Sequence, residues 1–176
     1  MPYLVRKLIK RDKLSGLEID GDIGEIWADI PTTEFRTTDG SLSTWKIETI
    51  EELDKAVLAI AVSSSEISKM DFIVLDIELI LKHDLSYEFT YAGIDIPVPD
   101  LQDTHCDIKG ITMDKLKCCA CLYSDIWKKE PEEGKYIVRY TSGEIKNLIK
   151  DAIKAGRVDR TKAFGKIAEV IDKLSA

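Results

Sequence analysis

The densest cluster of polar side chains runs from Asp100 to Asp107 and holds three aspartates, a histidine and a cysteine. Three further cysteines follow shortly afterwards in the chain. His105 or Cys106, together with Cys118 and Cys121, would supply the nitrogen and sulfur ligands that zinc prefers. These four residues are therefore the candidate metal ligands of the protein.

The cysteines have a second interpretation, which their neighbours in the sequence favour. Cys118 and Cys121 lie in a segment where Leu116, Leu122 and Tyr123 give a predicted helix an apolar face. Free cysteine is among the most buried residue types and behaves as a small hydrophobic side chain. We therefore expect the cysteines to pack in the core rather than to hold a metal or carry out redox chemistry, and we expect no cofactor.

A second candidate site combines Asp76 with Asp103 and His105. Asp76 follows a strongly apolar run, and ligands of open α/β sheets bind beyond the carboxyl ends of the strands. A carboxylate there could hold a divalent metal or act as a base, which would make the protein a metal-assisted enzyme. The favoured alternative is that Asp76 caps a short helix that begins near Glu78.

Several common catalytic patterns are missing from the sequence. It contains no G-x-x-x-x-G-K-[ST] loop and no G-x-G-x-x-G after a predicted strand, which argues against nucleotide chemistry of those two kinds. The chain has two histidines, His83 and His105, and their spacing assigns no Ser-His-Asp arrangement, because such triads are defined by geometry. The sequence leaves enzymatic activity open and favours a non-enzymatic role.

Charge is distributed unevenly along the chain. The net charge is −7, yet residues 135–176 hold ten Lys and Arg against five Asp and Glu. The rest of the chain is correspondingly acidic, notably the turn-rich segment 16–40, and such asymmetry is a hint about partners or internal docking.

The basic residues of the C-terminal part form a candidate partner-binding surface: Lys146, Lys150, Lys154, Arg157 and Arg160. Three interpretations fit them, in decreasing order of preference. They are an ordinary solvated helix face, a surface that docks on acidic protein (of this chain or of a partner), or a nucleic-acid contact.

The stretch from Leu42 to Ile77 predicts a strand, an amphipathic helix and a second strand. Apolar residues alternate over 42–47, recur at helical spacing over 50–62 and fill four successive positions over 72–75. The last pattern is typical of a strand that is covered on both faces. A right-handed crossover is the natural interpretation, and an antiparallel return is the alternative.

The remaining patterns complete an α/β or α+β fold, in which helices pack on a single mixed sheet. Strands are expected over 42–47, 71–77, 87–92 and 136–140, edge strands over 2–9 and 104–108, and helices over 50–62, 113–129, 144–155 and 161–174. Capping boxes are expected at Thr49 with Glu52 and at Thr141 with Glu144. We expect one domain over 1–176, the alternative being a C-terminal subdomain over 135–176 behind the break at Pro131 and Gly134.

Composition places the protein among ordinary globular chains, with 44% hydrophobic and 32% charged residues. The charged N-terminus does not resemble a secretory signal, no stretch approaches the roughly 20 apolar residues of a membrane span, and unpaired cysteines suit a reducing cytosol. We therefore expect a cytoplasmic location without membrane contact.

Taken together, these patterns favour a prokaryotic-type accessory or immunity-like protein that acts through protein–protein contacts. A metal-assisted enzyme near Asp76, Asp103 and His105 is the first alternative. A nucleic-acid-binding module that uses the basic C-terminal helices is the second.

Overall fold

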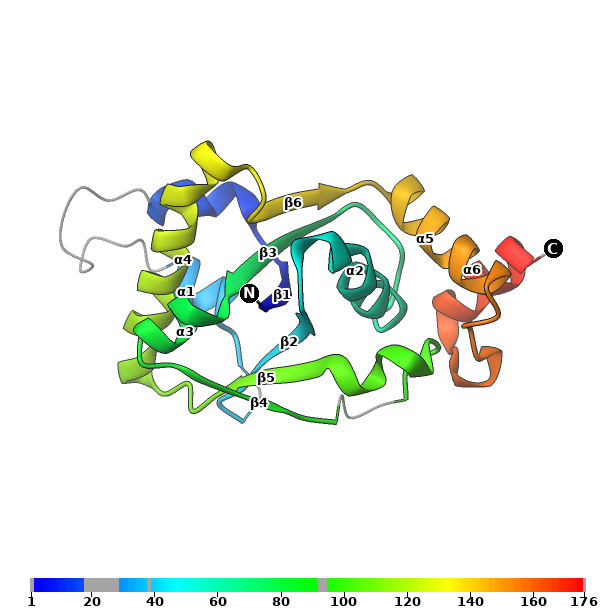
Figure 1. Ribbon diagram of the computed structural model, residues 1–176, viewed down its shortest axis with the longest axis horizontal. Coiled ribbons are helices and arrows are strands. Elements are labelled where there is room, and N and C mark those ends of the chain that lie inside the picture. The colour runs from blue at the N-terminus through cyan, green and yellow to red at the C-terminus, as the bar shows by residue number, and fades with distance from the viewer. Residues whose placement is uncertain (1, 18–28, 38, 92–94, 176) are drawn as a thin grey trace.

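One six-stranded sheet organises the computed structural model, which describes residues 2–17, 29–37, 39–91 and 95–175 (Figure 1). The strands are β1 (Tyr3–Leu8), β2 (Leu42–Ile47), β3 (Met70–Asp76), β4 (Ser86–Phe89), β5 (His105–Lys109) and β6 (Ile137–Tyr140), in the order β4-β5-β2-β1-β3-β6 across the sheet. The α-helices are α1 (Asp29–Glu34), α2 (Leu53–Val62), α3 (Ile77–Lys82), α4 (Met113–Glu133), α5 (Ser142–Lys154) and α6 (Gly165–Ser175). Short 3-10 helices are η1 (Arg11–Leu17), η3 (Ile50–Glu52), η4 (Pro99–Thr104) and η5 (Arg160–Lys162).

The predicted unit over 42–77 is confirmed as β2, α2 and β3, and the fold is of the α+β class. Both β2 and β3 pair antiparallel with β1, so they run in the same direction with β1 between them. The chain therefore does cross over through α2, but the two strands that it joins are not neighbours. Every pair of adjacent strands is antiparallel, which corrects the expected mixed sheet, because β1 inserts into the crossover.

Two strands that were expected at an edge are internal. β1 lies between β2 and β3, and β5 lies between β4 and β2. The prediction for β1 was wrong because it rested on the charges of Arg6 and Lys7. The guanidinium of Arg6 is instead accommodated inside the fold, where it donates hydrogen bonds to the backbone oxygens of Ser43 and Glu34 at 2.9 and 3.2 Å.

Helices cover both faces of the sheet. Val5 lies opposite Trp45 and Val74, and Trp45 lies opposite His105, so these four residues form one row on the face that α2 covers. Arg6, which points to the other face, reaches the end of α1. This double coverage explains the four successive apolar residues of β3, which are all fully buried, and it confirms that prediction.

Figure 1 shows how the remaining helices are grouped, with α1, α3 and α4 at one end of the molecule and α5 and α6 at the other. No helix within the described part of the chain is both long and apolar enough to cross a membrane.

Three of the predicted helix ends are settled by local hydrogen bonds. The capping box of α5 is confirmed, because Thr141 and Glu144 satisfy each other's backbone N–H groups. The one expected at Thr49 is absent, since Glu52 accepts a hydrogen bond from the Glu48 N–H at 2.9 Å instead. Pro131 lies inside α4, which continues to Glu133 and ends at Gly134 in the left-handed conformation, φ 61°.

The C-terminal strand β6 joins the main sheet, as expected, by pairing with β3. Asp71 of β3 fixes this junction, because Arg139 Nε and Nη2 donate to its carboxylate at 2.8 and 3.1 Å and Arg11 Nη1 donates at 3.2 Å. Burial alone would raise the pKa of Asp71, but the hydrogen bonds from the two guanidinium groups outweigh it and hold the pKa below its ordinary value.

We predict that Asp71→Asn lowers the free energy of unfolding by about 2 kcal/mol at pH 7, the usual size of a lost charge-assisted hydrogen bond. Because the pKa of Asp71 is depressed in the folded state, its stabilisation is complete above the unfolded pKa of about 3.9 and is lost as the pH falls further. Urea unfolding from pH 7 to pH 3 should show the wild type converging on the variant. The exposed pair Glu66–Lys166 provides the control Glu66→Gln, for which no such convergence is expected.

A second structural prediction concerns Glu34, a fully buried carboxylate at the end of α1. It accepts hydrogen bonds from the backbone N–H groups of Ile9, at 3.1 Å, and of Lys10, so it holds the end of β1 against α1. Glu34→Ala should lower the unfolding free energy by about 3 kcal/mol, since two partly buried N–H groups lose their acceptor and a buried side chain is removed. The exposed Glu48→Ala should change it by less than about 0.5 kcal/mol in the same urea titration, and equal losses would contradict the assignment.

Candidate functional site

The candidate site begins where β2 separates from β1. The pairing of these strands covers Tyr3 to Val5 against Trp45 to Ile47, whereas β1 pairs with β3 along its whole length. The first half of β2 therefore leaves β1 while it stays paired with β5. The guanidinium of Arg6 bridges the resulting split, because Arg6 Nη1 donates to the Ser43 backbone oxygen.

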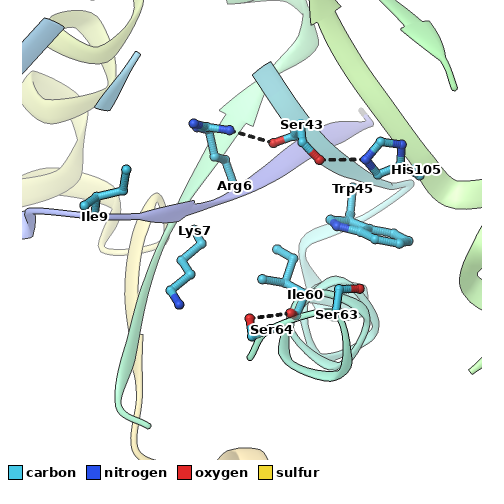
Figure 2. A pocket seen from close by; sticks show the side chains of 9 residues that line it. All are labelled: Arg6, Lys7, Ile9, Ser43, Trp45, Ile60, Ser63, Ser64 and His105. Carbon is cyan, nitrogen blue, oxygen red and sulfur yellow. Dashed lines mark hydrogen bonds between the residues drawn. The ribbon is translucent and has the colours of Figure 1, made fainter. Parts of the chain in front are cut away.

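A cavity of about 380 Å³ opens at this split, on the face of the sheet that α2 covers (Figure 2). Its walls combine apolar side chains from β2, from α2 and from the residue after β1 with polar groups from β1, β2, β5 and the turn after α2. The lining residues are Arg6, Lys7, Ile9, Ser43, Trp45, Ile60, Ser63, Ser64 and His105.

Ser43 and His105 meet in this cavity. The Ser43 hydroxyl lies 2.6 Å from His105 Nε2, and Figure 2 shows the two side chains pointing toward one another from β2 and β5. On the other side of the ring, Nδ1 lies 3.1 Å from the Thr90 backbone oxygen and 3.0 Å from its hydroxyl. Since a carbonyl oxygen can only accept, we assign the proton to Nδ1, which leaves Nε2 as the acceptor for Ser43.

Burial distinguishes the two members of this pair. His105 is only 5% exposed and its ring packs edge-on against Trp45, with centroids 4.9 Å apart, whereas Ser43 is exposed. Asp107 approaches from the same face of β5, its carboxylate 3.9 Å from His105 Nε2 and 3.2 Å from Lys109 Nζ. The arrangement is a solvent-accessible hydroxyl, a shielded and oriented imidazole, and a carboxylate nearby.

The three residues of the proposed metal-assisted site are not brought together. His105 lines the cavity, whereas Asp103 is exposed on η4. Asp76 lies on β3, three strand spacings from β5, or about 14 Å across the sheet at ~4.8 Å per strand. Its carboxylate accepts a hydrogen bond from the Glu78 N–H at 2.9 Å, so it caps α3 as the alternative interpretation had it.

The four cysteines are free thiols, and none of them belongs to a group of metal-ligating side chains within the described residues. Cys106 and Cys119 are buried, while Cys118 and Cys121 are half-buried on α4. Burial raises the pKa of the Cys106 thiol to about 11 and that of Cys119 to about 12. Both thiols are therefore inert packing groups at neutral pH.

The basic C-terminal residues are partly neutralised by the chain itself. Arg157 binds Asp100 at 2.7 Å, Arg160 binds Asp172 at 2.6 Å, and Lys154 lies 3.7 Å from Asp151. Lys146 and Lys150 are exposed on α5, with no carboxylate partner among the residues that the structure describes. Of the acidic segment over 16–40, residues 18–28 and 38 lie outside the described residues.

A second surface lies along β4, which has a neighbour on one side only in the described sheet. Phe89 and Tyr91, at its end, are 59% and 64% exposed. Phe89 also lines a groove of about 310 Å³, together with Lys46, whose Nζ lies 5.4 Å from the centre of the Phe89 ring. The other lining residues are Ile47, Glu48, Glu52, Lys55, Asp100, Leu101, Thr104 and Arg157.

Sequence reasoning identified His105 but did not single out Ser43, although the alternation of the strand puts it on the same face as Trp45 and Ile47. The pairing that brings them together joins β2 to β5, with Trp45 opposite His105. Ser43 and His105 are far apart in the sequence, and no local pattern predicts that these two strands are neighbours.

Comparisons of the chain with models of protein families, with curated proteins and with solved structures find no match.

We predict that thiol labelling follows the burial of the cysteines. At pH 8 the thiolate fraction of Cys106 and Cys119 is at least about 100-fold smaller than that of an ordinary thiol, so only Cys118 and Cys121 should react rapidly with Ellman's reagent. All four should react in urea. Peptide mapping of the labelled protein checks the assignment, and early labelling of Cys106 or Cys119 would contradict it.

Proposed function

We propose that this protein acts by contact with another protein, as an accessory or immunity-like protein of a prokaryotic-type cytoplasm, and that β4 is the strand to which the partner binds. The observation that carries the proposal is the combination of an unpaired strand edge with two largely exposed aromatic side chains, Phe89 and Tyr91.

The physical basis is the set of backbone groups that an edge strand leaves free. An exposed edge presents a row of unpaired N–H and C=O groups, and a partner segment in extended conformation can add to it as a further strand. Three of the four residues of β4 are exposed, so nothing within the described fold covers it. The occupant we infer is therefore an extended segment of the partner protein.

The side chains around β4 suit such a contact. Aromatic residues and arginine are enriched at the energetic centres of protein interfaces, and Phe89 lies in a groove that also holds Arg157. The charges in this groove are already paired within the chain, as Lys46 with Glu48, Lys55 with Glu52, and Arg157 with Asp100. A rim of satisfied ion pairs around an aromatic centre favours an apolar anchor on the partner.

The other two candidate functions have less support. Of the five candidate basic residues, Arg157 and Arg160 bind carboxylates of this chain and Lys154 lies near Asp151, which leaves Lys146 and Lys150 without a carboxylate partner among the described residues. The carboxylate of Asp76 accepts the capping hydrogen bond of α3 and lies far from His105. A nucleic-acid contact or a metal-assisted reaction would need groups that the fold already uses.

The test compares the exposed aromatics of β4 with an equally exposed aromatic elsewhere. The protein is isolated from its own host at low salt, the co-purifying polypeptide is identified by native mass spectrometry, and its affinity for purified variants is measured by calorimetry. Phe89→Ser with Tyr91→Ser should weaken binding at least about 30-fold, the size of an interface hot spot. Phe164→Ser is the matched control, since Phe164 on the C-terminal side is 75% exposed, and it should bind as the wild type does.

Two results would contradict the proposal. One is a partner whose affinity is unchanged by the double substitution at β4. The other is the recovery of a bare monomer at every salt concentration, with no polypeptide that binds the purified protein.

A further inference from the structure

We propose that the cavity at the split between β1 and β2 is an acyl-transfer site, with Ser43 as nucleophile and His105 as general base. Its substrates would be small activated esters whose acyl chain carries a negative charge. This proposal does not depend on the docking of a partner at β4, because the cavity and the groove beside β4 share no lining residue.

The nucleophile and the base have the geometry that such catalysis requires. A serine hydroxyl is a weak nucleophile until a base within hydrogen-bond distance accepts its proton. Ser43 lies 2.6 Å from His105 Nε2, the nitrogen that we assign as the acceptor. The hydroxyl is exposed to the cavity while the imidazole lies behind it, so a substrate reaches the nucleophile before it reaches the base.

Two further groups support the base. The backbone oxygen of Thr90 accepts a hydrogen bond from Nδ1–H, which holds the ring in the tautomer that leaves Nε2 free to accept. Asp107 places a carboxylate 3.9 Å from Nε2, where it stabilises the imidazolium that forms when His105 takes the proton. The division of labour is that of a catalytic triad, although the orienting group and the carboxylate are different residues.

The charge of the cavity indicates the class of substrate. Among the residues that the structure describes, no carboxylate belongs to the lining of the cavity. Lys7 also lines the cavity (Figure 2) and has no carboxylate partner among the described residues. Trp45 and Ile60 form an apolar wall beside it. A short acyl chain that ends in a carboxylate would place its methylenes on this wall and its charge on Lys7.

Arg6 points to the other face of the sheet, but its guanidinium reaches the split beside Ser43 and lines the cavity there. Its guanidinium lies within 2.9 Å of the Ser43 backbone oxygen, and its Nε is buried without a hydrogen-bond partner. The negative charge of a tetrahedral intermediate develops next to Ser43, where a fixed cation stabilises it more than it stabilises the neutral ester.

The reaction has two steps, acylation of Ser43 and hydrolysis of the acyl group. In the first, Ser43 Oγ forms a bond to the acyl carbon, its proton passes to His105 Nε2, and the bond to the leaving alkoxide breaks as that oxygen takes the proton. In the second, His105 accepts a proton from water, the hydroxide attacks the acyl carbon, and the bond to Ser43 Oγ breaks with return of the proton. The sum is hydrolysis of one ester by one water.

The experiment uses two chromogenic esters of the same length, 4-nitrophenyl hydrogen succinate and 4-nitrophenyl butyrate. The wild-type protein should release a burst of 4-nitrophenolate equal to its own concentration, faster with the succinyl ester by about fivefold or more, the effect of one ion pair. Mass spectrometry of the quenched protein should find the succinyl group on Ser43.

Four variants assign the roles. Ser43→Ala should abolish the burst, and His105→Gln should slow acylation by about 100-fold. Lys7→Met should remove the preference for the succinyl ester over the butyryl ester. Ser65→Ala, an exposed serine outside the cavity, is the matched control and should behave as the wild type.

Because His105 is buried and its variant could fail to fold, labelling of the wild type by a fluorophosphonate, mapped to Ser43, gives a second measurement.

Three outcomes would overturn the proposal. They are a wild-type protein that gives neither burst nor fluorophosphonate adduct, an acyl group that maps to Lys7 or another residue instead of Ser43, and a burst that survives Ser43→Ala. If substitution of Phe89 and Tyr91 leaves the partner affinity unchanged while the burst is normal, only the proposed docking function is contradicted. The failures of the two proposals can therefore be told apart.

Discussion

The guanidinium of Arg6 is the interaction on which the centre of this structure depends. In the middle of a sheet, a strand that leaves its neighbour exposes backbone groups, and each buried group without a partner costs about 1–3 kcal/mol. β2 pairs with β1 only from Trp45 onward, and ahead of that point Arg6 replaces the missing pairing by donating to the backbone oxygens of Ser43 and Glu34. An apolar residue in this place could not do so. The charge of Arg6 predicted that β1 is an edge strand. In the structure the same guanidinium satisfies backbone groups at the split, so β1 can lie in the centre of the sheet.

The split has a consequence for the strand on the other side. Since β2 leaves β1 but keeps its pairing with β5, the first half of β2 is aligned by β5 alone. This alignment places Ser43 beside His105 and keeps its hydroxyl at the cavity instead of under a neighbouring strand. The same arginine thus lies at the opening of the cavity and binds the backbone of the residue that faces it. From the dense polar cluster over 100–107, His105 is the residue that lines the cavity. Its contacts are set by the pairing of β5 with β2 and not by its neighbours in the sequence.

The sequence predicts the parts of this fold that depend on local chemistry. The crossover over 42–77, the coverage of β3 on both faces, and the caps at Asp76 and Thr141 follow from periodicity and side chains a few residues apart. Strand order does not follow in this way, because it depends on which strands pair across the whole chain. That is why β1 and β5 were expected at edges, and why Ser43 was not associated with His105. The charge of Arg6 was misleading for the same reason, because its hydrogen bond to the backbone oxygen of Ser43 joins residues far apart in the sequence and leaves no local pattern.

The strand β4 and the residue that follows it contact both surfaces, the groove through Phe89 and the cavity through Thr90. Phe89 lies opposite Cys106 and so points to the face away from His105, whereas the next residue, Thr90, holds the imidazole through its backbone oxygen and donates its own N–H to the His105 backbone oxygen at 3.1 Å. A strand that adds to the outer edge of β4 would use the backbone groups directed away from β5, so these contacts of Thr90 would stay in place. Such a partner would restrain the segment that orients His105 and contact neither Ser43 nor Lys7. Substitutions at Phe89 and at Ser43 therefore test different properties of one sheet.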